Sequence, residues 1–276
     1  MIVDKLLRLD RRIIFALIAV AVGVPLASGA RIDPGRNPRS EQVYNHIEQL
    51  KPGSVVVIAF DYGPSSMPEL QPMAVAIARH ALKRNLRVVG LTLDAAAPIL
   101  VDTVLNRVGT ELGKEDGVDY VNLGFNPGYT AVIVGMGTDI GEQYRTDFKG
   151  RPYGSLEVTR GLRNYDDIGL LVDLASSNTP SAWVQFAHLR YGAKVAAGVT
   201  AVMAQDYYPY LQSKQLIGLL NGMKGAAEYE KLVGAPGDGM GGMVAQSYSQ
   251  LLIILLVVFG NVVYFLHRRR LRRSSI

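Results

Sequence analysis

Two short apolar runs, each ending at an aspartate, set the pattern of the central part of the chain. Val55 to Phe60 is rich in Val and Ile and ends at Asp61, and Val88 to Leu93 ends at Asp94. Between them, apolar residues recur with helical spacing from Pro68 to Asn85. Runs that are apolar at every position are typical of strands buried on both faces, and two such strands joined by a helix run parallel. The pattern therefore predicts a parallel α/β sheet.

Further runs of the same kind extend the predicted sheet. We expect its remaining strands at Tyr120–Gly124, Ala131–Met136, Ile168–Leu174 and Val195–Val202. A long helix is predicted after the last of them, over Leu211–Leu232. The predicted fold class is α/β, with a mostly parallel, Rossmann-like sheet of about six strands, flanking helices, and a transmembrane helix near each end of the chain.

Both ends of the chain have an apolar segment next to a basic tail. Residues 13–30 begin with Ile13 to Leu26, which is almost wholly apolar. This pattern is typical of a transmembrane signal anchor, and also of a signal peptide cleaved near Ala30. Residues 245–266 include the uncharged stretch Leu251 to Leu266, which is followed by a cluster of arginines. A second transmembrane helix with a cytoplasmic basic end is therefore predicted.

These segments predict the organisation of the whole chain as a cell-membrane protein. Both termini are expected in the cytoplasm, with residues 31–249 on the extracytoplasmic side. The predicted parts are a cytoplasmic basic tail at 1–12, the signal anchor or signal peptide at 13–30, a linker at 31–39, an extracytoplasmic α/β domain at 40–233, a flexible tether at 234–244, a transmembrane helix at 245–266 and a cytoplasmic arginine-rich tail at 267–276.

Charge and cysteine content exclude several kinds of partner and chemistry. The formal net charge is +5 at pH 7, and residues 267–276 alone contain five arginines and no acid. Because the tail at 1–12 is also basic, the central domain is slightly acidic, which argues against nucleic acid as a partner. The chain has no cysteine, which excludes disulfides and thiolate chemistry.

Acidic residues at or near strand ends are the recurrent polar feature of the domain. Ligands of open parallel sheets bind in the crevice beyond the carboxyl ends of the strands. We therefore expect a ligand site among these acids and the polar residues close to them: Asp61, Ser65, Asp94, Asp173, Asp206, Tyr207 and Tyr208. The tyrosines also fit an interfacial aromatic belt near a bilayer. The sequence does not identify a cofactor, and its histidines do not have metal-ligand spacing.

Some polar residues of this region have structural explanations. Ser66 and Glu69 have the spacing of a capping box, in which the serine bonds to the first turn of a helix and the glutamate reaches back. Asp94 is placed to cap the helix that follows it. These roles compete with a functional interpretation of the same loops.

Three glycines and one asparagine suggest contacts between helices. Gly218, Gly222 and Gly225 lie within the predicted long helix, where an interior glycine costs about 1 kcal/mol relative to alanine. Close packing against another backbone would explain them, either in the protein's own sheet or in a partner subunit. Asn261 lies inside the second transmembrane helix, where its amide predicts a helix–helix contact or is a tolerated polar residue. We expect a homo- or hetero-oligomer.

The sequence lacks the short motifs that identify common hydrolases and nucleotide-binding proteins. It has no G-x-S-x-G elbow, no H-E-x-x-H and no Walker motif. The strand–helix–strand rhythm of Ser54 to Met136 is similar to that of the ClpP/signal-peptide-peptidase group, which includes membrane-anchored serine peptidases. This similarity implies a peptidase-like activity, but the serine that those enzymes require has no counterpart here.

Three functions therefore fit the sequence. The leading hypothesis is a membrane-anchored extracytoplasmic domain that serves as a non-enzymatic binding or assembly component of a membrane protein complex. The second is an extracytoplasmic small-ligand-binding or sensory domain. The third is a ClpP/signal-peptide-peptidase-like hydrolase without a recognisable nucleophile motif.

Overall fold

The computed structural model describes residues 10–274, so most of the predicted basic tail at 1–12 lies outside the described residues. The chain divides into two units. One is an α/β domain formed by Pro34–Met240, and the other contains the segments on either side of it, Met1–Asp33 and Gly241–Ile276. Each unit is described by itself below.

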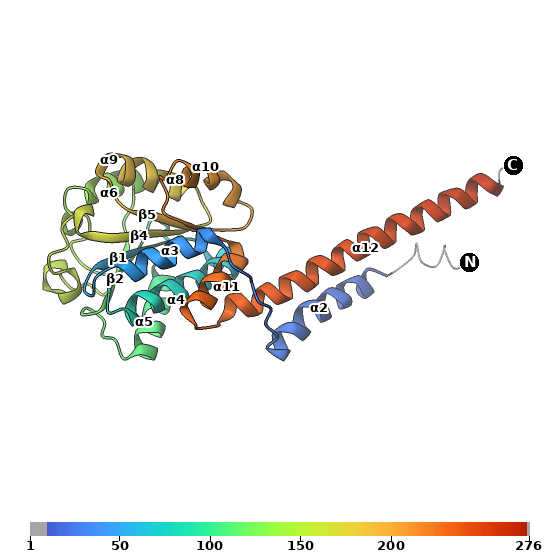
Figure 1. The fold of residues 1–276 in the computed structure, drawn as a ribbon, viewed down its shortest axis with the longest axis horizontal. Coiled ribbons are helices and arrows are strands. Elements are labelled where there is room, and N and C mark those ends of the chain that lie inside the picture. The colour runs from blue at the N-terminus through green and yellow to red at the C-terminus, as the bar shows by residue number, and fades with distance from the viewer. Residues whose placement is uncertain (1–9, 275–276) are drawn as a thin grey trace. The chain divides into compact units, whose positions relative to one another are not determined.

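A six-stranded sheet forms the centre of the domain, and all of its neighbouring strands run parallel. The strand order is β3-β2-β1-β4-β5-β6. The strands are β1 (Val55–Asp61), β2 (Arg87–Thr92), β3 (Tyr120–Phe125), β4 (Ile168–Ala175), β5 (Val195–Val199) and β6 (Leu219–Asn221). The chain builds outward from β1 in one direction and then from β4 in the other, so the order reverses between these two central strands (Figure 1).

Helices cover both faces of the sheet (Figure 1). One face packs against α3 (Pro38–Gln49), α4 (Met67–Lys83), α5 (Pro98–Leu112) and α11 (Gly222–Val233). The other face packs against α6 (Tyr129–Met136), α7 (Ile140–Gln143), α8 (Thr179–Trp183), the single π turn η5 (Val184–His188), α9 (Leu189–Tyr191), η6 (Ala204–Tyr207) and α10 (Tyr208–Gln212). Short 3₁₀ turns complete the chain at η1 (Pro64–Ser66), η2 (Tyr153–Ser155), η3 (Glu157–Thr159) and η4 (Tyr165–Asp167).

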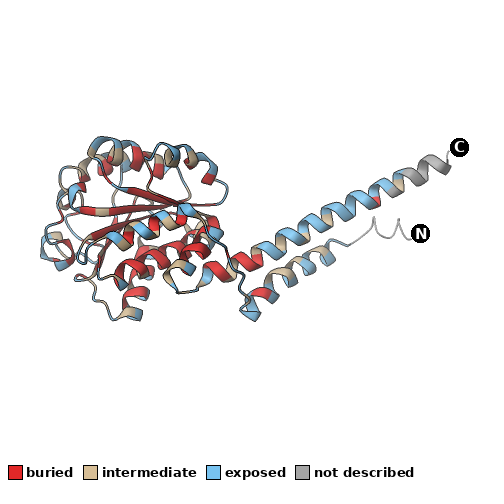
Figure 2. Ribbon diagram, viewed as in Figure 1, coloured by how far each residue is buried: buried red, intermediate tan, exposed pale blue. Residues whose placement is uncertain are grey.

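The apolar runs predicted as strands occupy the core for the expected reason. Every residue of β1 is buried, because this strand has a neighbour on each side and helices on both faces (Figure 2). Alternate side chains of β1 and β4 therefore belong to two different hydrophobic cores, one on each face of the sheet. This arrangement is the three-layer α/β architecture that near-continuous apolar strands favour.

Two of the predicted elements are wrong. Ala131–Met136 is part of helix α6, because Gly128 precedes it with a φ of 81° and only one side of the segment is needed for the core. The long helix predicted over Leu211–Leu232 is interrupted: α10 ends at Gln212, strand β6 follows, and α11 begins at Gly222. A short apolar run does not distinguish strand from helix. One helix was therefore predicted as a strand, and one strand was predicted as part of a helix.

The three glycines that we expected in one helix are therefore in different elements. Gly218 precedes β6, Gly222 begins α11 with a φ of 53°, and Gly225 lies in the first turns of that helix. A Cβ atom on Gly218 would lie 2.6 Å from the Arg39 carbonyl oxygen, and one on Gly225 would lie 2.8 Å from the backbone of Leu220. The close backbone approach that these glycines allow is made within the chain.

Two helices are long and apolar enough to cross a membrane. They are α2 (Arg11–Ser28), with a mean hydropathy of 1.8, and residues Asp238–Phe265, with a mean hydropathy of 2.0, which belong to α12 (Asp238–Ser274). Most of their apolar side chains are exposed, as Figure 2 shows. The predicted tether at 234–244 is shorter in the structure, because α12 already begins at Asp238.

Candidate functional site

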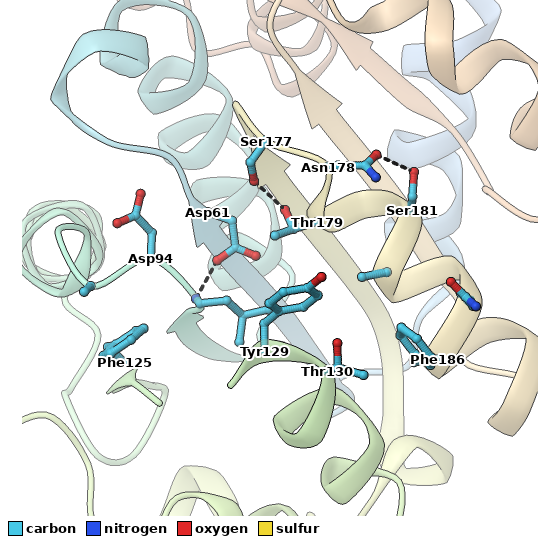
Figure 3. Close-up of a pocket in the computed structure, with 14 residues that line it drawn as sticks. Asp61, Asp94, Phe125, Tyr129, Thr130, Ser177, Asn178, Thr179, Ser181 and Phe186 are labelled. Atoms are coloured by element: carbon cyan, nitrogen blue, oxygen red, sulfur yellow. Dashed lines mark hydrogen bonds between the residues drawn. The ribbon is translucent and has the colours of Figure 1, made fainter. Parts of the chain in front are cut away.

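A crevice of about 670 Å³ opens at the carboxyl ends of the central strands, where the strand order reverses. Its walls come from the last residues of β1 and β3, from the loops after β2 and β4, and from the helical segments α6, α8 and η5 (Figure 3). The residues that line it are Asp61, Leu93, Asp94, Ala95, Phe125, Tyr129, Thr130, Ser177, Asn178, Thr179, Ser181, Ala182, Gln185 and Phe186. Open parallel sheets place ligand sites at this position, because adjacent loops diverge there.

Asp61, the last residue of β1, lies at the base of the crevice and is only 2% exposed. Its Oδ1 accepts a hydrogen bond of 2.6 Å from the Leu93 N–H (Figure 3). Its Oδ2 accepts a longer one, of 3.5 Å, from the indole N–H of Trp183. Burial raises the pKa of Asp61 to about 6, although these donors act in the opposite direction. The carboxyl group is therefore held in position and titrates close to neutral pH.

Asp173 lies directly behind Asp61 in the sheet. The β1–β4 register pairs Asp61 with Ala175, so Asp173, two residues earlier on β4, points to the same face. Its side chain is fully buried, and as a carboxylate neither of its oxygens has a hydrogen-bond donor among the described residues. Burial and the charge of Asp61 raise the pKa of Asp173 well above its usual value. One proton shared between the two carboxyls supplies the missing hydrogen bond, so the pair carries about one negative charge at neutral pH.

The loop after β4 forms one wall of the crevice through polar side chains. The Ser177 hydroxyl donates to the Thr179 hydroxyl, and the Ser181 hydroxyl donates to the side-chain amide oxygen of Asn178 (Figure 3). Behind this loop, the buried Tyr207 hydroxyl donates to the Ser177 backbone carbonyl and to Asn178. The wall therefore presents hydroxyl and amide groups to the crevice from a loop that Tyr207 supports.

Three aromatic side chains give the crevice apolar surface. Phe125 ends β3, Tyr129 begins α6, and Phe186 lies in η5. Phe125 and Tyr129 are well exposed at the crevice mouth, at 38% and 51%. In Figure 3, Phe125 lies on the side of Asp94, whereas Phe186 lies on the side of Ser181. A ligand between them would contact rings as well as polar groups.

The charge of the crevice has one sign. Asp61 and Asp94 are its only ionisable acids or bases apart from the phenol of Tyr129, and none of the lining residues is Lys, Arg or His. Asp94 is half-buried, and its Oδ1 accepts from the Ala96 N–H at 2.9 Å, which fixes the turn before α5. Low-dielectric walls and two carboxyl groups make the crevice a region of negative potential.

The structure brings together only part of the predicted site. Asp61 and Asp94 line the crevice, Asp173 lies behind Asp61, and Tyr207 supports the β4 loop. Three other candidates lie outside the crevice. Ser65 is exposed in η1, Asp206 is exposed in η6, and Tyr208 packs under the Arg39 guanidinium, 4.1 Å from its ring centroid.

Sequence reasoning missed most of the crevice walls. The polar residues after β4 appeared only as a loop, and the aromatic residues come from three separate elements. Trp183 was also missed, although it is the only tryptophan in the chain and its ring is fully buried beside Asp61. A polar loop immediately after a central strand is the one signal that would have placed Ser177 and its neighbours at the site.

A second hollow of about 560 Å³ adjoins the crevice and shares Phe125 with it. It is lined by Tyr144, which is 3% exposed and whose hydroxyl has no hydrogen-bond partner among the described residues. Burial, followed by the charge of Asp61, raises the pKa of Tyr144. A neutral phenol thus lies within the electrostatic range of the Asp61 carboxyl.

The histidines of the domain are used in structural contacts. The imidazole of His46 bonds to the Gly169 carbonyl, His80 bonds to Glu48 and Tyr229, and His188 bonds to the Ala193 carbonyl. None of these hydrogen bonds joins a histidine to a serine, so the described part of the chain offers the hydrolase hypothesis no serine–histidine pair. In residues 10–274 no group of three or more His, Cys, Asp or Glu side chains is arranged to hold a metal ion.

Comparison with other proteins gives no relative from which a function could be transferred. No protein-family model matches the sequence, and no curated protein or solved structure matches it significantly. The function must therefore be argued from the crevice and from the two apolar helices.

Proposed function

We propose that this protein is a membrane-anchored domain that binds a small ligand in the crevice at the carboxyl ends of its central strands. One observation carries the proposal: a buried, near-neutral carboxyl group, Asp61, forms the base of a 670 Å³ crevice that its own side chains do not fill. A cavity of this size suits a small organic molecule. Perturbed ionisable groups in clefts are typical of functional sites, because burying them costs stability.

The strand order supports a Rossmann-like classification of the domain. The order β3-β2-β1-β4-β5-β6 is that of doubly wound sheets, whose ligands bind where the order reverses. The loop after β1 contains Tyr62, Gly63 and Pro64 and lacks the G-x-G-x-x-G spacing that holds a pyrophosphate. We therefore propose the Rossmann-like fold without a dinucleotide ligand.

The membrane arrangement expected from the sequence is part of the proposal. Helices α2 and α12 are the proposed membrane spans, with residues 31–249 on the extracytoplasmic side of the cell membrane. We propose that the domain works in a membrane complex with a second copy or another protein. The exposed apolar surface of both helices supports contact with lipid or with other helices. The amide nitrogen of Asn261 donates to the Val257 carbonyl of its own helix.

Blocking the crevice tests the binding function. Thr130 lies half-buried in the crevice wall at the start of α6, so Thr130→Phe fills part of the space. Thr103→Phe makes the same change on an exposed position of α5 outside the crevice. The full-length protein in detergent is screened against a small-molecule library by the fluorescence of Trp183. Compounds that bind the wild type and the Thr103 variant but not the Thr130 variant support the proposal. Binding that is unchanged in the Thr130 variant, or no binding by any compound, contradicts it.

Purification from native membranes in a mild detergent tests the complex. We expect a stoichiometric second chain or a homo-oligomer, identified by mass spectrometry and native mass. A solitary monomer from every detergent would contradict the assembly part of the proposal. It would not affect the proposed ligand binding in the crevice, because binding by the domain does not require a partner.

A further inference from the structure

The polar groups around Asp61 are incompletely satisfied. Asp173 is fully buried and has no donor for its two carboxyl oxygens apart from the proton shared with Asp61, and the buried Tyr144 hydroxyl has no hydrogen-bond partner among the described residues. Unsatisfied groups of this kind are rare in folded proteins, because a buried polar group without a partner has lost its hydrogen bonds to water and gained none in return. Because these groups lie next to an open crevice, a molecule bound there can supply interactions around Asp61 that the domain itself does not.

The charges of the lining residues restrict what that molecule can be. The crevice has carboxyl groups at its base and at its rim, from Asp61 and Asp94, and no cationic side chain. An anionic ligand such as a phosphate or a carboxylate would meet two carboxyl groups and no cation, with only neutral hydroxyl and amide groups as possible donors. A cation would be attracted to both aspartates and would add the donors that the buried pair lacks.

The remaining walls favour an organic cation over a metal ion. Among the described residues no cluster of three or more potential metal ligands occurs, at the crevice or elsewhere. The rings of Phe125, Tyr129 and Phe186 offer faces on which an ammonium group and its carbon chain both pack favourably. Hydroxyl groups of Ser177 and Thr179 can accept the N–H groups that the carboxylates do not.

We infer that the crevice binds an organic ammonium ion, whose charged group lies against Asp61 and whose carbon skeleton packs between the aromatic rings, and that the Asp61–Asp173 pair gives up its shared proton when the ammonium enters. This inference rests on the proposed ligand-binding function and names the chemical class of the ligand. The O–H bond of the shared proton breaks and solvent water or buffer takes the proton, so that the Asp61 carboxylate faces the ammonium group with the Asp173 carboxylate behind it; no other covalent bond changes.

Matched sets of compounds with one carbon skeleton and three head groups test the ligand class. A suitable series is phenethylamine, phenethyl alcohol and phenylacetate, extended to aliphatic and hydroxylated skeletons. Full-length protein in detergent is titrated with each, and the fluorescence of Trp183, whose N–H donates to Asp61, reports on the site. We expect the amines to bind at least about tenfold more tightly than their alcohol and acid counterparts, because the latter lose the charge pairing.

Three substitutions separate the charge effect from misfolding. Asp61→Asn keeps the shape of the side chain and should weaken amine binding by about 30-fold or more, as removal of one member of a buried charge pair does. Asp94→Asn keeps the acceptor for the Ala96 N–H and should weaken binding by a few-fold only, because Asp94 is at the rim. Asp206→Asn, an exposed acid outside the crevice, should leave binding unchanged. The Asp94 variant keeps the test valid if the Asp61 variant does not fold.

Calorimetry tests the proton step. Near pH 7, amine binding measured in buffers with small and large ionisation enthalpies should show release of up to one proton, and Asp173→Asn should bind amines without this release. Tighter binding of acids or alcohols than of amines would overturn the ammonium inference while leaving the crevice as a binding site. Equal binding of all three head groups would do the same. No binding by any compound would count against the proposed function itself. Amine binding without proton release would overturn the proton step alone.

Discussion

Asp61 on β1 and Asp173 on β4 face the same side of the sheet from neighbouring central strands, and both carboxyls are buried. Burial raises both pKa values, that of Asp61 to about 6 and that of Asp173 further above its usual value. An unfolded aspartate ionises near pH 4, so the folded protein binds more protons than the unfolded chain above that pH. The pair therefore contributes stability at low pH, and this contribution is lost as the pH rises through the two folded-state pKa values.

Replacing Asp173 should reduce the stability that the protein loses as the pH rises. We expect Asp173→Asn to be more stable than the wild type by about 1–3 kcal/mol at pH 8, with a smaller difference at pH 5, because an asparagine amide donates to Asp61 without carrying charge. Chemical unfolding of the detergent-solubilised protein, followed by Trp183 fluorescence, measures the difference. Asp166→Asn at an exposed position is the matched control and should change stability by less than about 0.5 kcal/mol. A pH-independent difference would mean that the pair does not share a proton.

Glu230 connects α11 to the start of α12. Its Oε2 accepts from the N–H groups of Gly237 and Met240, and its Oε1 accepts from that of Gly239. These N–H groups belong to the first turn of a helix and to the residue before it, where a carboxylate satisfies donors that have no partner within the helix. The carboxylate therefore fixes the residues by which the domain leads into its C-terminal helix.

We expect Glu230→Gln to destabilise the domain by about 1–3 kcal/mol, because the amide places N–H donors opposite backbone N–H groups. Hydrogen exchange should show the fastest gain at Gly237 to Met240, with little change in the central strands. Glu115→Gln is the control, since Glu115 is exposed and makes no contact of this kind. Unchanged exchange at Gly237 to Met240 would show that the backbone there does not depend on the carboxylate.

The elements that were predicted well from the sequence are those in which nearly every residue is apolar. Strands β1 and β2 are apolar at nearly all positions because both of their faces are covered, and this is visible without a structure. Strand β6 has only three residues between Gly218 and Gly222, too few to show a period of two. Its neighbours have helical spacing, so the pattern favoured a single helix.

Only those residues of the site that end a strand or directly follow one were predictable from the sequence. Asp61 and Asp94 follow strands directly, and the rule for parallel sheets places them at the crevice. Asp206 also comes shortly after a strand but lies on the exposed surface of η6, because the chain turns away after β5.

The capping box predicted at Ser66 and Glu69 is wrong: the Ser66 side chain makes no capping bond, and the Glu69 carboxylate accepts from the Ala201 N–H. Contacts between distant segments decide such roles.

Gly218 illustrates a packing requirement that sequence alone assigned to the wrong element. We expect Gly218→Ala to destabilise the domain by about 1–3 kcal/mol, because its Cβ would approach the Arg39 carbonyl and the Val43 side chain to 2.6 Å and would force a backbone shift. Gly154→Ala is the matched control, since no atom lies within 4 Å of its added Cβ. Urea unfolding of both variants measures the difference. Equal stability would mean that α3 and β6 can separate slightly at no cost.

The absence of cysteine from the sequence allows a direct test of the membrane arrangement. Single cysteines are introduced at Ser155, which is exposed in the α/β domain, and at Ser274, in the predicted cytoplasmic tail. Because arginine-rich segments stay on the cytoplasmic side, a membrane-impermeant maleimide applied to intact cells should label Ser155→Cys and not Ser274→Cys. After the membrane is permeabilised, both should react, which controls for the reactivity of each thiol. Labelling of Ser274→Cys in intact cells would reverse the orientation, whereas protection of both positions in intact cells would place the domain in the cytoplasm and its ligand among cytoplasmic amines.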